Sequence, residues 1–379
     1  MITSRQLFPL GKAYGAAFCN RVEETEQLVG NIRNSKHTLL IAPRRYGKSS
    51  LAERAMEKAK LPSIKINFHL STSEQEIADL ILNGVMQLIG AAIGKIEKLT
   101  NSIKKYLSNL ELVMKLGNEE VGLSLIPKKQ ENISVIISEA LLLLEKLLKE
   151  KKKRAVIFFD EFQEVDHISK TKGIEGAIRT AAQETEYLSI VFSGSIRSLL
   201  LTMFEDENRP LYKLCRKIKL DRISSADYQK HLQKIATGTW GNPLPPEVFS
   251  KIMQLSNRHP YYVNYLCDIV WEICQHPPKI TDVSKAWKIV ITEEWRDALK
   301  ELSDLPLGQR RILKFIANHA VTHLQSRAIS EALSMAVSSI ATSVNTLIEK
   351  DYIEKDPTGN YQIINPLLFS ILKDALLDG

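Results

Sequence analysis

A lysine and two serines, Lys48, Ser49 and Ser50, directly follow a loop that contains one glycine, Gly47. The loop comes after an apolar run, and the residues behind it have the pattern of a helix. In such a strand, loop and helix, backbone N–H groups and the helix N-terminus surround a β-phosphate. A lysine placed as Lys48 is bridges the β- and γ-phosphates, and a hydroxyl placed as Ser49 is binds Mg²⁺. The sequence therefore predicts a site for ATP and Mg²⁺.

The match to the phosphate-loop pattern departs from the usual form at one position. G-x-x-x-x-G-K-[ST] begins with a glycine, and Ala42 stands there, whereas the glycine nearest the phosphates is present. A strand, turn and helix with an incidental Gly-Lys-Ser is the alternative, and the context between an apolar run and a helix speaks against it. We expect the following residues to contact nucleotide: Pro43, Arg44, Arg45, Tyr46, Gly47, Lys48, Ser49 and Ser50.

Two adjacent carboxylates, Asp160 and Glu161, end the apolar segment 155–159. This pattern indicates a buried central strand, and nucleotides bind at the C-terminal edge of such strands in α/β sheets. Asp160 is expected to hold the Mg²⁺ shell with Ser49, and Glu161 to orient and polarise the attacking water. Many strands end in an acid at a turn, but an acidic pair downstream of a phosphate loop favours hydrolysis of ATP.

Further polar residues follow later apolar runs. Ser193 ends the run 188–192, where its hydroxyl could contact the γ-phosphate or the attacking water. A polar turn that bends at Gly194 explains the same residues equally well. Three arginines could each reach a phosphate, although a single arginine is more often a surface residue: Arg197, Arg209 and Arg216.

The elements that must position these residues predict an α/β fold, a P-loop NTPase parallel sheet followed by a helical lid and a winged-helix domain. Strands are expected at 37–41, 63–68, 155–159, 188–192 and 216–220, with helices between them. We expect an ATPase core over 1–222, with an insertion at 94–130 that includes a hairpin arm. A helical lid is expected over 223–303 and the winged helix over 304–379.

The charge of the predicted winged helix argues against DNA as its partner. From Lys300 onward, eight Lys and Arg stand against nine Asp and Glu. Its presumed recognition helix carries Ser, Thr and Asn and has no Lys or Arg before Lys350. Since DNA readers place cations against phosphates, we favour a packing or protein-contact role, with DNA binding as the alternative.

Composition sets wider limits. The 379 residues exceed one ordinary domain, and 44% hydrophobic and 25% charged residues are typical of a soluble globular protein. The net charge of +7 lies partly in runs that usually mark solvated helix ends. The four cysteines show no CxxC pair, and no signal or spanning segment is evident, so a cytoplasmic protein without a membrane is expected.

The order of motifs resembles the archaeal-type ATPases, a group of AAA+-related, STAND-like P-loop NTPases with an ASCE-like sheet. The strings that carry the resemblance are FCNRVEE (18–24), APRRYGKSSL (42–51), FFDEFQEV (158–165), FSGS (192–195), RPLYKLCR (209–216), HPYYVNYL (259–266) and NPLLFSIL (365–372).

The resemblance implies five parallel strands, one of them between the phosphate-loop strand and the strand that ends in Asp-Glu. It also implies that Asn20 and Arg21 lie near the base, and that His259 and Pro260 sit where the lid meets the nucleotide. Arg216 matches an arginine near the phosphates or a subunit boundary, but RPLYKLCR spaces it one residue further than the usual form, which weakens that assignment.

Several functions fit these residues. The favoured hypothesis is an ATP-hydrolysing switch that couples nucleotide state to lid and winged-helix position and acts on a macromolecular partner. The alternatives are a DNA-loading ATPase of the origin-recognition or transposition-regulator type, a nucleotide-binding scaffold and a small-molecule kinase. A homo-oligomer, with an arginine supplied by a neighbouring subunit, is left open by the sequence.

Overall fold

The computed structural model describes residues 3–94, 109–116, 121–127, 132–356 and 358–373. The chain divides into two compact units, and each is described by itself. Residues 21–42 and 48–220 form the first, which we call the sheet unit. Residues 1–20, 43–47 and 221–379 form the second, the helical unit.

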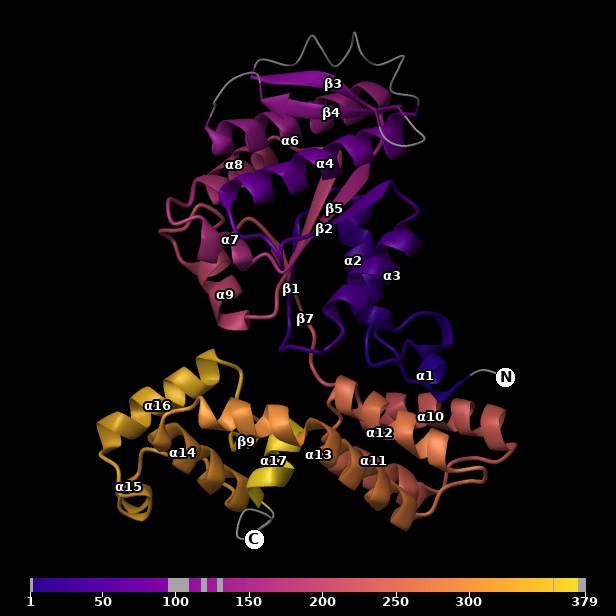
Figure 1. Cartoon of the computed structure of the whole chain (residues 1–379), viewed down its shortest axis with the longest axis vertical. Helices are drawn as coiled ribbons and strands as arrows, with labels where there is room; N and C mark the ends of the chain where they lie inside the picture. The colour runs from indigo at the N-terminus through magenta and orange to yellow at the C-terminus, as the bar shows by residue number, and fades with distance from the viewer. Residues whose placement is uncertain (1–2, 95–108, 117–120, 128–131, 357, 374–379) are drawn as a thin grey trace. The chain divides into compact units, whose positions relative to one another are not determined.

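A five-stranded parallel sheet, in the order β2-β5-β6-β1-β7, organises the sheet unit (Figure 1). Strand β6 lies between β1 and β5, which confirms the expected strand between the phosphate-loop strand and the Asp-Glu strand. All strands run the same way, so their C-terminal ends meet at one edge. The strands are β1 (Thr38–Ile41), β2 (Ser63–Asn67), β5 (Ala155–Asp160), β6 (Leu188–Ser193) and β7 (Arg216–Lys219).

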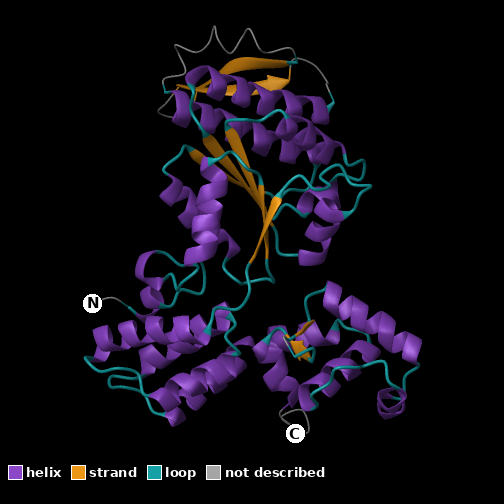
Figure 2. Ribbon diagram, turned by 180° about the vertical axis from the view of Figure 1, so that it is seen from behind, coloured by secondary structure: helices purple, strands orange, loops and turns teal. Residues whose placement is uncertain are grey.

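Helices cover the sheet because its central strands are apolar on both faces. Every residue of β1, β5 and β6 is buried, as a parallel sheet between helix layers requires. Helices α2 and α3 pack together and against β5 and β6, whereas α4, α6 and α8 form a second group (Figures 1 and 2). These helices are α2 (Val22–Arg33), α3 (Lys48–Ala59), α4 (Glu74–Ile93), α6 (Ile133–Lys151) and α8 (Gly173–Gln183).

The core under the second helix group is rich in phenylalanine. Phe162 packs edge-on against Phe192 with ring centroids 4.8 Å apart, and Phe159, Phe68 and Phe204 extend the cluster. The rings clamp the ends of β5 and β6 together directly beside their terminal polar residues. Two short helices complete this region, α7 (Glu164–Ile168) and α9 (Arg197–Glu205).

The expected insertion contains an antiparallel hairpin, β3 (Leu110–Leu116) with β4 (Val121–Pro127). This confirms the hairpin arm, while residues 95–108 of the expected insertion lie outside the described residues. Helix α4 is long and apolar enough to cross a membrane, but 56% of its most apolar window is buried, as in the core helix of a globular domain.

The helical unit has one hydrophobic core that runs through both its expected lid and its C-terminal part. Trp287 of α13 donates from Nε1 to Oγ of Ser370 in α17 at 3.2 Å, and Phe8 near the N-terminus packs edge-on against Trp271. The elements are α1 (Ser4–Leu7), a 3₁₀ turn (Gly15–Ala17), α10 (Ser225–Trp240), α11 (Pro246–Ser256), α12 (Pro260–Ile273), α13 (Ile280–Ser303), α14 (Leu307–Asn318), α15 (Arg327–Leu333), α16 (Val337–Glu349), β8 (Ile353–Lys355), β9 (Tyr361–Ile363) and α17 (Pro366–Lys373).

Candidate nucleotide-binding site

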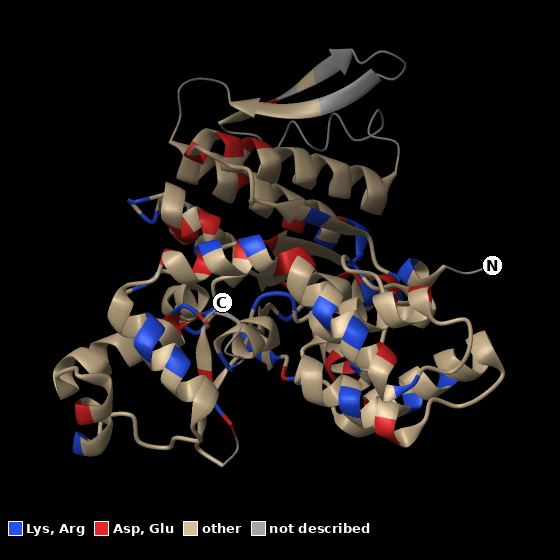
Figure 3. Ribbon diagram, turned by 60° about the horizontal axis from the view of Figure 1, so that its bottom comes forward, with Lys and Arg blue, Asp and Glu red and all other residues tan. Residues whose placement is uncertain are grey.

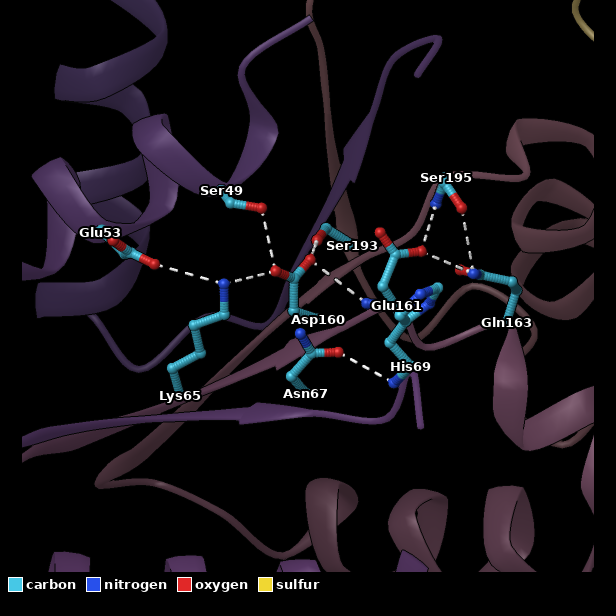
Figure 4. A network of polar contacts seen from close by, with 10 residues as sticks. All are labelled: Ser49, Glu53, Lys65, Asn67, His69, Asp160, Glu161, Gln163, Ser193 and Ser195. Atoms are coloured by element: carbon cyan, nitrogen blue, oxygen red, sulfur yellow. Dashed lines mark hydrogen bonds and ion pairs between the residues drawn. The ribbon is translucent and has the colours of Figure 1, made fainter. Parts of the chain in front are cut away.

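Asp160, the last residue of β5, is the centre of a polar cluster in the sheet unit (Figure 4). Its Oδ2 accepts from Ser49 Oγ at 2.9 Å, and its Oδ1 accepts from Ser193 Oγ at 2.5 Å. Lys65 of β2 brings Nζ to 2.6 Å from Oδ2. Three segments that are distant in the sequence therefore supply partners to one carboxylate, as expected where parallel strands end together.

This carboxylate is held in its ionised form. Burial alone would raise the pKa of Asp160, but hydrogen bonds from Lys65 and Ser193, and the charge of Lys65, outweigh it and lower the pKa. Lys65 also pairs with Glu53 of α3 at 3.3 Å. Asp160 is thus an anion at neutral pH, surrounded by groups that donate hydrogen bonds or carry positive charge.

Residues 43–47 of the phosphate loop bend sharply between β1 and α3. Gly47 has φ +86° and Arg45 has φ +64°, and a loop that alternates left-handed with ordinary backbone can form an anion-binding nest of N–H groups. A Cβ at Gly47 would touch nothing, so the glycine serves the backbone conformation rather than space. The buried Lys48 donates from Nζ to the carbonyl oxygen of Ala42 at 3.0 Å.

Glu161 leaves the strand with φ +54°, a conformation that costs a non-glycine residue about 1–2 kcal/mol. The Glu161 Oε2 accepts from Gln163 Nε2 at 2.7 Å and from the backbone N–H of Ser195 at 3.0 Å. Strained backbone held by several contacts is typical of functional positions.

The residues present fit a magnesium ion that is shared with a nucleotide. Mg²⁺ in such sites takes one or two protein oxygens and completes its shell with phosphate oxygens and waters. Ser49 Oγ and the ionised Asp160 supply such oxygens 2.9 Å apart. Within the described ranges no group of three or more His, Cys, Asp or Glu could hold a metal without a nucleotide.

The helical unit holds the loop residues Arg45 and Tyr46 together with α12 and α13. The Arg45 guanidinium lies 4.2 Å from the ring centroid of Tyr261 and 3.7 Å from Glu294 Oε2. The Tyr46 ring packs edge-on against His259 at 4.8 Å. These contacts join part of the phosphate loop to the N-terminal end of α12.

His259 is neutral at physiological pH. Burial, and then the charges of Arg222 and Arg45, lower its pKa from 6.5 to about 3. Among the described side chains, its Nδ1 is one of the buried polar atoms without a hydrogen-bond partner. Pro260 follows at the first position of α12, where its fixed φ and missing N–H suit a helix start. Both residues remain predicted nucleotide contacts.

The predicted arginines occupy different environments. Arg216 is exposed at the first position of β7 and pairs in register with Thr38, the first residue of β1. The phosphate loop follows the last residue of β1, at the opposite edge of the sheet. A parallel strand puts its first and last residues at opposite edges, so Arg216 does not lie beside the end of β1 that leads into the loop. Its implied place near the phosphates or a subunit boundary stays a prediction. Arg209 is buried in an ion pair with Glu175 at 2.5 Å.

Asn20 and Arg21 remain predictions as nucleotide contacts. Both have a positive φ and stand directly before α2, and the buried Arg21 donates to Glu24 Oε1 at 2.8 Å. Ser50 is buried in the first turn of α3, and Arg44 is exposed in the loop.

Two residues of the cluster escaped the sequence analysis, Lys65 and Gln163. A lysine in a strand at the edge of a sheet has an ordinary explanation, since it discourages pairing with another edge. Gln163 lies inside the string FFDEFQEV, in which only the two acids have a predicted role. That string is the one signal for Gln163, because nothing in the local pattern says where an amide two residues beyond Glu161 would turn.

Comparison with solved structures identifies the fold class as that of P-loop NTPases, with a helical C-terminal region. A Walker-type ATPase of Pyrococcus abyssi matches with a TM-score of 0.70 at 18% identity, over 97% of this chain and 100% of the other. The ORC2 protein of Aeropyrum pernix, solved as ADPNP–ADP complexes, matches with 0.59 at 13% identity, over 98% and 96%. The ORC1 protein of Aeropyrum pernix in complex with DNA matches with 0.50 at 12% identity, over 98% and 96%.

No protein-family model matches the chain, and no curated protein sequence matches it. At identities below one fifth, the structural likeness establishes the shared fold, and the activity has to be argued from the residues of this chain.

Proposed function

We propose that the protein binds ATP with Mg²⁺ and hydrolyses it. The observation that carries this proposal is the meeting of Ser49, Asp160 and Ser193 within hydrogen-bond distance, directly after the phosphate loop and at the C-terminal ends of β5 and β6. A hydrogen-bond network with a purely structural role can also hold a buried acid. Such a network would not require that one of its hydroxyls, that of Ser49, directly follows a phosphate loop. When bound, Mg²⁺ neutralises charge on the phosphates as the terminal group leaves.

Each residue of the site has a role in this proposal. Lys48 contacts the β- and γ-phosphates, and Ser49 and Asp160 hold the metal. Ser193 keeps Asp160 in place through the bond to Oδ1. Glu161 receives its hydrogen bonds on Oε2, and we assign its other oxygen to the attacking water.

We further propose that nucleotide state is coupled to the helical unit. Arg45 and Tyr46 belong to the loop expected to surround the phosphates, yet they contact Tyr261, Glu294 and His259 in the helical unit. The ion pair of Arg45 with Glu294 is loose, at 3.7 Å, and phosphate would compete with Glu294 for the same guanidinium. Binding and release of ATP would thus change the contacts of α12 and α13.

Arg222 offers a way to transmit this change to the C-terminus. Its guanidinium donates to the backbone oxygens of Asn257 at 2.5 Å and Ile364 at 3.3 Å, and to Glu354 at 3.1 Å. We read α14, α15, α16 and the β8–β9 hairpin as a winged helix. Arg222 therefore ties the helices of the proposed lid to the wing, which we expect to move with them.

A protein partner suits the C-terminal part better than DNA. Helix α16, the presumed recognition helix, exposes only uncharged residues up to Ile348, whereas the exposed cations Arg310, Arg311 and Lys314 lie on α14. Lys, Arg, Asp and Glu are distributed over several other helices of this unit (Figure 3). DNA recognition would need a cationic face. The four cysteines are free thiols, which suits the cytoplasmic location that we propose.

ATP turnover by wild type, Lys48→Ala and Glu161→Gln, with and without duplex DNA, tests hydrolysis and the partner together. We expect turnover in wild type, loss of nucleotide binding in Lys48→Ala, and binding without turnover in Glu161→Gln. Stimulation by DNA that weakens with rising salt would favour the DNA-loading alternative. Tight ATP binding without wild-type turnover would contradict the hydrolase.

Proteolysis of the helical unit in the presence of ADP or a non-hydrolysable ATP analogue tests the coupling. We expect the cleavage rate in wild type to depend on which nucleotide is bound, and Arg45→Gln and Glu294→Gln to remove that dependence. Lys288→Gln is the matched control, because it removes an exposed positive charge from α13 that belongs to no predicted nucleotide contact. Equal cleavage of wild type with both nucleotides would contradict the switch.

A further inference from the structure

Gln163 is a buried amide whose nitrogen faces oxygen atoms. Its side chain is 1% exposed, and Nε2 donates to Glu161 Oε2 at 2.7 Å, to Glu164 Oε1 at 3.2 Å and to Ser195 Oγ at 3.3 Å (Figure 4). The backbone N–H of Ser195 donates to the same oxygen of Glu161 at 3.0 Å. Two donors from two chain segments thus hydrogen-bond to the same carboxylate oxygen of Glu161.

Gly194 provides the space that this amide occupies. A Cβ built at Gly194 would lie 1.9 Å from Gln163 Oε1 and 2.9 Å from Leu200 Cδ1. Real Cβ contacts are never so short, so any larger residue would push the amide away from Glu161. The sequence explained this glycine as a bend, but in the structure it makes room for the partner of Glu161.

The buried amide of Gln163 is not explained by a contribution to the stability of the fold. Among the described side chains, its Oε1 is a buried acceptor without a hydrogen-bond partner. An unsatisfied buried polar atom is destabilising, and an apolar side chain of similar length would avoid that cost. What the amide does accomplish is the contact of its Nε2 with Glu161.

We propose that Gln163, in the space left by Gly194, is a positioning residue for Glu161. This inference rests on the proposed hydrolysis of ATP. A glutamate side chain has several rotatable bonds, and two donors on Oε2 restrict it to one arrangement. Figure 4 shows the second oxygen of Glu161 turned away from Gln163 and Ser195. That oxygen is thereby held ready for one water.

The step that depends on this arrangement is the attack on the γ-phosphate. The water oxygen forms a bond to the γ-phosphorus as the bond from that phosphorus to the bridging oxygen breaks, which releases ADP. The proton of the water is accepted at the free oxygen of Glu161 and passes to the product phosphate. A freely rotating Glu161 would seldom be in place for this transfer.

Steady-state kinetics of Gln163→Met and Gly194→Ala test the proposal. Methionine has a similar length and cannot donate, and the alanine displaces the amide. We expect kcat to fall by about 10–100-fold in each, with KM and affinity for a non-hydrolysable ATP analogue within about twofold of wild type. The double variant should be no slower than the slower single variant, since both remove the same contact. Gly176→Ala is the matched control, because a Cβ there meets nothing.

The split between kcat and KM separates positioning from a merely structural role. Gln163→Met should lower kcat alone, because it removes only the contact that holds Glu161, whereas a disturbed site would also raise KM. An unchanged kcat in Gln163→Met, or losses of kcat, nucleotide affinity and thermal stability in parallel, would overturn the proposal. If Glu161→Gln abolishes turnover while Gln163→Met leaves kcat unchanged, this inference alone fails. If wild type binds ATP without hydrolysing it, both proposals fail.

Discussion

Arg209 holds two acidic side chains in the sheet unit, and its replacement by methionine is expected to destabilise that unit strongly. Its guanidinium donates from Nη2 to Glu175 Oε1 at 2.5 Å and from Nε to Glu175 Oε2 at 3.2 Å. Nη2 also lies 2.6 Å from Asp166 Oδ1. Glu175 has no exposed surface, so Arg209→Met would leave its carboxylate buried without a cation.

The expected magnitude follows from this burial. Breaking a buried ion pair from one side costs about 3–5 kcal/mol, because the remaining charge is uncompensated. At about 2–4 °C per kcal/mol for a unit of this size, the unfolding midpoint should fall by roughly 6–20 °C. Burial raises the pKa of Glu175 while Arg209 opposes that rise, so the carboxylate is already costly to keep ionised.

Glu175→Gln should be much milder, because it removes the buried charge and leaves Arg209 paired with the partly exposed Asp166. Replacing both Arg209 and Glu175 by apolar residues should recover most of the stability lost in Arg209→Met. Thermal unfolding followed by circular dichroism, with ATP turnover measured beside it, checks all three. An Arg209→Met protein with normal stability but no turnover would refute the structural role and favour the alternative that Arg209 contacts a phosphate.

Three further predictions concern the site. Lys65→Met removes the cation beside Asp160, so the nucleotide-free protein should be less stable than wild type. In a thermal-shift assay, Mg²⁺ with ATP should raise the unfolding temperature of this variant by more than that of wild type. An equal or smaller rise would contradict this. The pKa of His259 is lowered from 6.5 to about 3, so the folded protein binds fewer protons than the unfolded chain between these values. Stability should therefore rise with pH across that window, and urea unfolding of His259→Phe at pH 4 and pH 7 should show a smaller difference than wild type. Gly47→Ala, which meets no atom but forces alanine to φ +86°, should weaken ATP binding in a titration while shifting global stability by no more than about 1–2 kcal/mol.

Patterns among neighbouring residues were enough to predict many of the secondary-structure elements and the residues at their ends. The apolar run, glycine and lysine around Gly47 required a strand, a sharp loop and a helix, because each of those features is a property of neighbouring residues. The acids after β5 and the hydroxyl after β6 indicated strand ends, and parallel strands bring their ends to one edge. The expected strand between β1 and β5 is present, although its prediction depended on family resemblance.

The partners of those residues were decided by the tertiary structure. Lys65 reaches Asp160 because β2 pairs with β5 in a register that puts Asn67 opposite Asp160, and no local pattern encodes that register. The resemblance implies that Arg216 lies near the phosphates or a subunit boundary, and only the register of β7 with β1 shows that it stands at the sheet edge away from the loop. The contact of Gln163 with Glu161 depends on room left by Gly194, a residue from another strand end.

A sequence therefore specifies which groups stand at the ends of its elements, because helix and strand periodicity act over a few residues. These local patterns do not show which buried charges form contacts, since a side-chain contact depends on strand order, register and the space left by residues far along the chain. Ser49, Asp160 and Glu161 could be named from the sequence for the first reason. Lys65, Gln163 and the structural role of Arg209 emerged only from the fold for the second.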